Sequence, residues 1–205
     1  MWLSKLFRGL GFRDFLIRRI LWSSEHWVEN EIEYTALKKL GIKSRVCPSF
    51  LGEIDDYKIS YKYNKKPKVY TSVSGDRFEL YGWDNIDALA RRFPDIEFHL
   101  YGNKSRWGVA NENIIVHGRV SKERMNREIK QMQGALRLLP FEGASEIVVK
   151  AMLWGHYCFS SIDYPGTNSP SELNLLLSRK SANIKYRDWW LKNLNQYPWN
   201  INTQK

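Results

Sequence analysis

Residues 135–162 read ALRLLPFEGASEIVVKAMLWGHYCFSSI, and this stretch decides the fold class. An apolar run at 135–139 is followed by a short loop, by an apolar segment of helical length at 145–154, and by a second apolar run at 156–162. Two buried strands joined by a helix of about ten residues are typical of a parallel crossover. The stretch therefore predicts an α/β protein with a parallel sheet.

The same alternation precedes this stretch and predicts a doubly wound sheet. Further strands are expected at 68–73, 96–101 and 114–117, and further helices at 84–92 and 121–133. In such sheets, ligands bind outside the carboxyl ends of the strands. The loops that follow residues 73, 101, 117, 139 and 162 are therefore the expected places for a site.

The first fifty residues predict a smaller unit of strand, helix and strand. Its expected elements are a short apolar strand at 20–23, a helix at 25–40 that ends at Gly41, and a strand at 42–50. Residues 51–67 are polar and rich in tyrosine, as in a connection between units. The expected parts are residues 1–50, a linker at 51–67, and a larger domain at 68–205 with a crossing helix at 186–194.

Composition limits the class of protein and its partners. The 205 residues are 43% apolar and 14% aromatic, which is enough for one buried core and excludes general disorder. The excess of 32 Lys and Arg over 22 Asp and Glu gives a charge of +10, so an anionic partner is expected: a nucleotide phosphate, an anionic membrane or a nucleic acid. Because only charge points to a nucleic acid and no binding motif for one occurs, we expect no nucleic-acid partner.

The cysteines and the apolar runs point to a cytoplasmic protein. Cys47 and Cys158 lie far apart, which indicates neither a disulfide framework nor a zinc site. No apolar run approaches the roughly 20 residues that span a bilayer. Charged residues interrupt the apolar N-terminal stretch, so no signal peptide is predicted.

Residues 2–22 combine apolar and basic side chains. The apolar residues of the first turns recur at helical spacing, and basic residues accompany them: Trp2, Leu3, Leu6, Phe7 and Leu10 with Lys5, Arg8, Arg13, Arg18 and Arg19. Such a helix could lie on an anionic membrane, which would make the protein peripheral on the inner face of a membrane. The alternative is that the apolar face packs on the protein's own core.

Two of the loops contain residues suited to an anionic ligand. After the strand at 68–73, Gly75 lets the backbone approach a phosphate and Arg77 can pair with it. The loop before the helix at 145–154 consists of Glu142, Gly143, Ala144, Ser145 and Glu146. The first amides and the dipole of that helix favour negative charge. The alternatives are a plain strand-to-helix turn and an ordinary capping box, with Ser145 capping the helix.

The run from Glu142 to Gly155 resembles the signature E-G-x-x-x-x-x-x-E-A-x-x-x-G of retaining, family-4-like glycosyltransferases of the GT-B fold. Four flanking segments resemble the strands and loops of the same nucleotide-sugar domain: 68–75, 98–102, 116–120 (VHGRV) and 163–167. The resemblance runs over roughly residues 17–195. It implies the Rossmann-like half of a GT-B fold, preceded by a remnant of the acceptor-side domain.

The resemblance also implies roles for individual residues. Glu142 would lie near the transferred sugar as the catalytic carboxylate, and His117 could contact the sugar or a phosphate. The donor would be held by Gly75, Arg77, Gly143, Ala144, Ser145, Glu146 and the residue at position 150. The family has a glutamate there that accepts hydrogen bonds from the ribose, whereas this chain has Lys150, and an ammonium cannot accept one. Tyr81 stands where the family has a lysine on the diphosphate.

The expected function is therefore glycosyl transfer from a nucleotide-diphosphate sugar to an acceptor. No D-x-D sequence occurs, so we expect a metal-free, hexosyltransferase-type reaction with no cofactor besides the nucleotide sugar. The alternative is a non-catalytic GT-B remnant that binds a partner or a membrane, which the loss of the second glutamate favours. Most of the acceptor-side domain is expected to be absent, so a second subunit could supply it.

Overall fold

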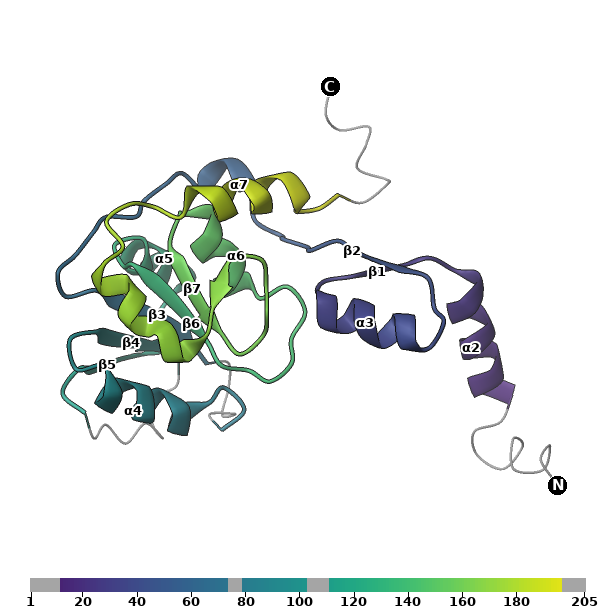
Figure 1. The fold of residues 1–205 in the computed structure, drawn as a ribbon, viewed down its shortest axis with the longest axis horizontal. Helices are drawn as coiled ribbons and strands as arrows, with labels where there is room; N and C mark the ends of the chain where they lie inside the picture. The colour runs from purple at the N-terminus through teal and green to yellow at the C-terminus, as the bar shows by residue number, and fades with distance from the viewer. Residues whose placement is uncertain (1–11, 74–78, 103–110, 197–205) are drawn as a thin grey trace. The chain divides into compact units, whose positions relative to one another are not determined.

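The computed structural model describes residues 12–73, 79–102 and 111–196, which belong to two compact units (Figure 1). The smaller unit consists of two stretches of chain, one up to Ser49 and one from Asn195. The larger unit runs from Phe50 to Leu194. The predicted donor residues Gly75 and Arg77 lie outside the described residues, as does the predicted amphipathic segment as far as residue 11.

Six parallel strands form the sheet of the larger unit, in the order β5-β4-β3-β6-β7-β8. Their bounds are β3 Lys68–Ser72, β4 Glu97–Tyr101, β5 Ile114–Gly118, β6 Gly134–Arg137, β7 Tyr157–Ser160 and β8 Thr167–Asn168. The predicted doubly wound parallel sheet is confirmed. Strand β8 was not predicted, because its two residues make no apolar run.

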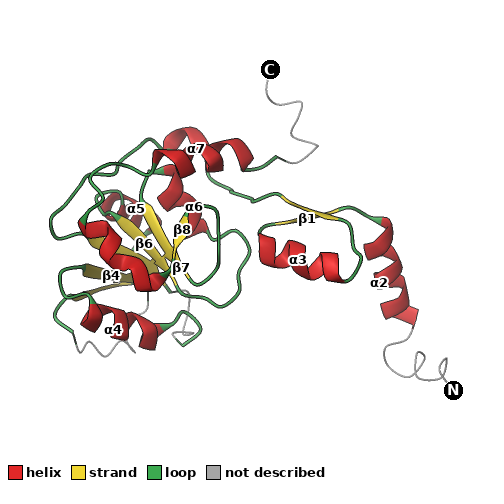
Figure 2. Ribbon diagram, viewed as in Figure 1, coloured by secondary structure: helices red, strands yellow, loops and turns green. Residues whose placement is uncertain are grey.

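Helices cover both faces of this sheet (Figure 2). Their bounds are η1 Ile54–Asp56, α4 Trp83–Arg92, α5 Lys122–Ile129, α6 Glu146–Leu153, η2 Pro170–Leu177 and α7 Ile184–Asn193. Neighbouring strand residues alternate between the faces: Tyr70 packs in the layer of α5, α6 and α7, and Val69 packs in the layer of α4 and η2. The period of two residues is that of a sheet buried on both sides.

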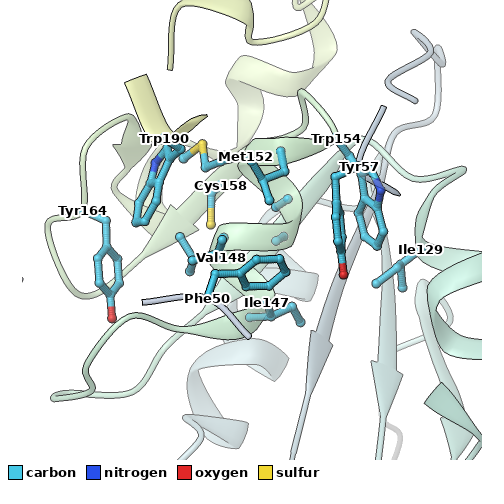
Figure 3. Close-up of a cluster of buried hydrophobic side chains, with 14 of the residues drawn as sticks. Phe50, Tyr57, Ile129, Ile147, Val148, Met152, Trp154, Cys158, Tyr164 and Trp190 are labelled. Atoms are coloured by element: carbon cyan, nitrogen blue, oxygen red, sulfur yellow. The ribbon is translucent and has the colours of Figure 1, made fainter. Parts of the chain in front are cut away.

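Helix α6 is the centre of one layer, and every residue from Ile147 to Leu153 is buried. Figure 3 shows Met152, Trp154 and Trp190 in this layer. The indole Nε1 of Trp190 donates to the carbonyl of Pro165 at 2.9 Å, which fastens α7 to the loop after β7. Because α6 is buried from Ile147 onward, its buried charged residue, Lys150, needs a partner inside the protein.

Residues 51–67, expected as a linker, lie within the larger unit and contribute Tyr61 to its core. Ser60 Oγ lies 3.1 Å from His156 Nε2, and His156 Nδ1 lies 3.1 Å from the hydroxyl of Tyr70. Burial lowers the pKa of His156 to about 3, so its ring is neutral near pH 7. This chain of hydrogen bonds fastens the segment to the sheet.

The smaller unit contains α2 Phe12–Ser23, β1 His26–Val28, α3 Glu31–Lys39 and β2 Ser44–Val46. Strands β1 and β2 pair in parallel, and α3 lies between them in the sequence, so the order strand, helix, strand is present, but β1 lies within the residues predicted as helix. The strand predicted at 20–23 is wrong, because these residues end α2. A short apolar run does not distinguish a strand from a helix. The helix predicted at 25–40 starts later, where the side chain of Asn30 accepts a hydrogen bond from the amide of Glu33 at 3.0 Å.

Candidate functional site

The candidate site lies where the strand order reverses. From β3 the chain adds β4 and β5 on one side, and it then returns to add β6, β7 and β8 on the other side. Strands β3 and β6 are neighbours, and predicted site residues follow the carboxyl end of each in the sequence. Ligands of doubly wound sheets bind at this topological switch point.

Arg137 joins the ends of these two central strands and holds Glu142. The guanidinium Nη1 donates to the carbonyl of Ser72 at 3.2 Å. Its Nε donates to Glu142 Oε2 at 2.7 Å, and its Nη2 donates to Glu142 Oε1. The guanidinium carbon also lies 4.9 Å from the ring centroid of Tyr81. The predicted catalytic carboxylate therefore accepts two parallel hydrogen bonds from one guanidinium, which fix its orientation.

The loop from Glu142 leads into the first turn of α6. The hydroxyl of Tyr164 donates to the carbonyl of Gly143 and holds the loop from the side of β7. Ser145 is the N-cap residue, with extended backbone, but its side chain makes no capping hydrogen bond. The capping box considered from the sequence is therefore wrong at Ser145: its Oγ is buried and has no hydrogen-bond partner among the described residues.

Lys150 lies one turn into α6, with only 5% of its side chain exposed. Its Nζ lies 2.7 Å from Glu146 Oε1 and 3.3 Å from Asn126 Oδ1 of α5. Lys122 approaches the same carboxylate at 3.5 Å. Burial alone would raise the pKa of Glu146, but the hydrogen bond and charge of Lys150, with those of Lys122, lower it. The lysine at the position where the resemblance predicts a ribose contact is thus one half of an internal ion pair.

His117 belongs to a separate cluster on β4, β5 and α5. Its Nε2 lies 2.9 Å from His99 Nδ1, and its Nδ1 lies 3.5 Å from Glu128 Oε2. The ring stacks on Tyr101, with the centroids 4.3 Å apart. Burial, with the neighbouring charge of His117, lowers the pKa of His99 to about 4, and burial also lowers the pKa of His117. The described contacts of His117 are all with β4 and α5. These contacts give the ring a structural role in joining the two elements.

The structure places Glu142, Gly143, Ala144, Ser145 and Glu146 in one loop and the first turn of α6, and their predicted role at the donor stays a prediction. Sequence reasoning missed Arg137, although a charged residue inside the apolar run at 135–139 was a signal. It also missed Asn126, whose pairing with Lys150 depends on how α5 packs on α6.

The described residues contain no cluster of three or more His, Cys, Asp or Glu side chains placed to hold a metal ion. Over the same ranges, no helix combines the length and the apolar character needed to cross a bilayer.

Comparisons with known proteins found similarity in structure only, since no protein-family model and no curated protein matches the sequence. The lipopolysaccharide outer core galactosyltransferase WaaB, in its apo form, matches with a TM-score of 0.64 at 17% identity, over 84% of this chain and 58% of that chain. Sucrose-phosphate synthase from Thermosynechococcus elongatus gives 0.62 at 12%, over 89% and 57%. Anabaena HepE, in complex with UDP and glucose, gives 0.53 at 15%, over 82% and 58%.

This chain has the Rossmann-like fold of GT-B glycosyltransferases. The predicted resemblance is thereby confirmed at the level of the fold, and its retaining, family-4-like character stays a prediction. The chain spans less than two thirds of the length of each of the three proteins.

Proposed function

We propose that this chain binds a nucleotide-diphosphate sugar at the switch point between β3 and β6 and transfers the sugar to an acceptor, with retention and without a metal ion. The observation that carries the proposal is the junction of β6 and α6. There the first turn of a buried helix opens at the sheet's carboxyl end, beside the fixed carboxylate of Glu142. HepE, a structure of the same fold, contains UDP and glucose, which supports a nucleotide sugar as the donor.

The donor diphosphate would lie on the first amides of α6, from Gly143 to Glu146, where the helix dipole favours negative charge. Gly75 and Arg77, from the loop after β3, would contact the same phosphates. His117 would be at most a distant contact, because its described hydrogen bonds hold it against β4 and α5.

In the proposed reaction, the bond between the anomeric carbon and the diphosphate oxygen breaks, and the oxygen keeps the electron pair. An acceptor hydroxyl oxygen bonds to the same carbon, and its proton passes to the departing diphosphate. Negative charge therefore grows on the leaving group, which fixed amide donors and Arg77 would stabilise. Glu142, oriented by Arg137, would lie beside the sugar and stabilise positive charge at the anomeric carbon.

Titration calorimetry with uridine and guanosine diphosphate sugars, in the presence of a chelator, tests donor binding. Glu142→Gln should lower turnover on the order of a hundredfold. Glutamine offers Arg137 one acceptor oxygen in place of two, so the free energy of unfolding is measured as well, and turnover is compared at a temperature where both proteins are folded. The absence of binding for every diphosphate nucleotide, or full activity of Glu142→Gln, contradicts the proposal.

A non-catalytic role is the second candidate, favoured by the ion pair of Lys150 and Glu146. A ribose can donate no hydrogen bond to that ammonium, and Glu146 is already engaged. In this case the chain would use the fold to bind a partner, such as a subunit that supplies an acceptor domain. Nucleotide binding with no hydrolysis or transfer, unchanged by Glu142→Gln, would favour this role over catalysis.

Membrane attachment through residues 2–22 is part of the proposal, with the protein peripheral on the cytoplasmic face. Three large apolar side chains in the described part of α2 are exposed to solvent: Leu16, Ile20 and Trp22. Exposed apolar groups beside basic ones favour an anionic bilayer. Removal of residues 1–12 should leave a folded protein that sediments less with anionic vesicles. If the truncated protein aggregates and the parent does not sediment with vesicles, residues 2–22 belong to the protein core instead.

A further inference from the structure

Two segments of the larger unit meet at the amino-terminal end of the sheet, away from the candidate site. Residues 57–66 run across the starts of β3, β6 and β7: the carbonyl of Lys62 accepts from Gln133 Nε2 at 2.8 Å. Residues 177–185 lead from η2 into α7. The hydroxyl of Tyr61 donates to the carbonyl of Arg179, which joins the two segments. In Figure 1 they are the blue loop before β3 and the yellow-green loop before α7.

The joined segments carry a concentration of positive charge. We call the following residues the basic face: Lys58, Ile59, Lys62, Tyr63, Lys65, Leu177, Arg179, Lys180, Ile184 and Lys185. All are exposed, and neither segment contains an acidic residue. None of the six cations forms an ion pair within the described parts of the chain. Six unneutralised charges on one face attract an anionic surface.

The basic face also exposes apolar side chains, unlike an ordinary solvated surface. Ile59 is 50% exposed and Ile184 is 42% exposed, with Tyr63 and Leu177 close behind. Ile59 and Ala182 border the same glycine, Gly155: a Cβ atom there would lie 3.6 Å and 3.1 Å from their methyl groups. The apolar groups of the two segments are therefore neighbours.

A cavity of about 430 Å³ opens beside these residues. Its lining includes Tyr157, Thr167, Arg179, Asn183, Lys185 and Tyr186. Arg179 lies over the ring of Tyr157, with its guanidinium carbon 5.3 Å from the ring centroid. The hydroxyl of Tyr157 donates to the carbonyl of Ser181 at 3.0 Å, so the loop is held in place. The charged lining residues are all cations, as a phosphate group requires.

We propose that the basic face docks on an anionic phospholipid surface. Ile59, Ile184, Tyr63 and Leu177 enter the headgroup boundary, the cations pair with lipid phosphates, and the cavity takes one headgroup phosphate between Arg179 and Lys185. Each basic residue near such a surface strengthens binding. The face lies at the end of the sheet opposite the switch point, so docking leaves the donor site open. The proposal depends on neither glycosyl transfer nor residues 2–22.

The side chains favour lipid over nucleic acid. Single-stranded nucleic acids bind through aromatic rings on which bases stack. The basic face exposes one aromatic ring, that of Tyr63, and its other exposed apolar groups are aliphatic. Branched aliphatic side chains insert into a headgroup region and give a base no flat surface.

The test is sedimentation of the full chain with vesicles of phosphatidylcholine alone or with phosphatidylglycerol. One variant reverses charge, Lys180→Glu with Lys185→Glu, and a second removes apolar groups, Ile59→Ser with Ile184→Ser. Matched controls are Arg127→Glu with Lys192→Glu, and Ile115→Ser, all exposed and outside the basic face. Circular dichroism melts establish that every variant is folded.

The parent should bind only the phosphatidylglycerol vesicles, and added salt should weaken binding. The affinity of the two basic-face variants for the phosphatidylglycerol vesicles should fall by roughly tenfold or more. The affinity of the control variants should equal that of the parent. Equal binding of parent and basic-face variants, or equal losses in the controls, overturns the proposal even if residues 2–22 bind lipid. Binding to an RNA homopolymer in place of vesicles also overturns it. Nucleotide calorimetry on the same variants should be unchanged, which separates this test from that of the donor site.

Discussion

The buried cations at the carboxyl end of the sheet differ from the six exposed cations of the basic face in whether a carboxylate pairs with them. At the carboxyl end, the buried cations Arg137 and Lys150 each hold a carboxylate, Glu142 and Glu146. At the amino end, the six cations of the basic face hold none among the described residues. Burial explains the difference, because a desolvated charge needs a partner, whereas an exposed charge keeps its water. The buried cations fix the positions of Glu142 and Glu146 by direct contact. The exposed cations of the basic face attract anions over a distance that salt limits to about 10 Å.

The largest expected effect comes from removing the cation at the switch point. Arg137→Ala removes a buried cation that donates to Glu142 and to the carbonyl of Ser72, so stability should fall by about 3 kcal/mol. Urea unfolding measures this change. Arg91→Ala is the matched control: it removes an exposed cation, 65% exposed, that pairs with Asp87 at 2.9 Å, and should cost under about 1 kcal/mol. Equal losses for the two variants would show that the carboxyl-end pair is no more than a surface contact.

Reversal of the second buried cation should have the next largest effect. Lys150→Glu places a carboxylate beside Glu146 and should cost about 2 kcal/mol, because both groups then repel in a partly buried position. The double change Glu146→Lys with Lys150→Glu should recover much of the loss. If Lys150→Glu instead keeps full stability and strengthens nucleotide binding, position 150 serves the ribose and the ion pair is incidental.

Acid should weaken the folded state through its buried histidines. The pKa of His99 is lowered to about 4 and that of His156 to about 3, each by burial, against 6.5 in the unfolded chain. Between pH 6.5 and about 4 the unfolded state binds more protons, so stability should fall as pH falls through this window. Urea unfolding against pH measures the slope. His99→Gln should reduce the number of protons taken up on unfolding, which this slope measures, by roughly one. An unchanged slope would contradict the burial of the His99 ring.

The smallest expected effect on stability is at the basic face. Lys180→Glu with Lys185→Glu should change the free energy of unfolding by less than about 0.5 kcal/mol, because neither side chain has an ion pair in the described residues. The same variant should lose vesicle binding. A large loss of stability would mean that these cations are structural, like those at the carboxyl end, and would remove the contrast between the two ends.

Much of the larger unit could be predicted from its sequence, because strands buried on both faces contain short runs of apolar or aromatic residues, as at 157–159. The short run at 20–23 could not be assigned, since periodicity needs more residues than it offers. The loop from Glu142 to Glu146 was predictable because its residues are consecutive.

The partners of that loop were not predictable. Arg137 and Tyr164 reach it from other elements, so their contacts depend on how strands and loops pack. The hydroxyl of Ser145, which has no hydrogen-bond partner in the described parts of the chain, departs from the local rule, because a serine before a helix ordinarily caps it. Local sequence therefore placed the loop, and tertiary packing decided what its side chains do.

Hydrogen exchange of the full chain with and without UDP or GDP, in the presence of a chelator, tests the central claim most directly. If the diphosphate lies on the first turn of α6, the amides from Gly143 to Val149 should exchange more slowly with nucleotide present. Amides of the basic face should not change. Nucleotide that binds without slowing exchange in this turn, or that protects the amino end of the sheet instead, would contradict a donor site at the switch point.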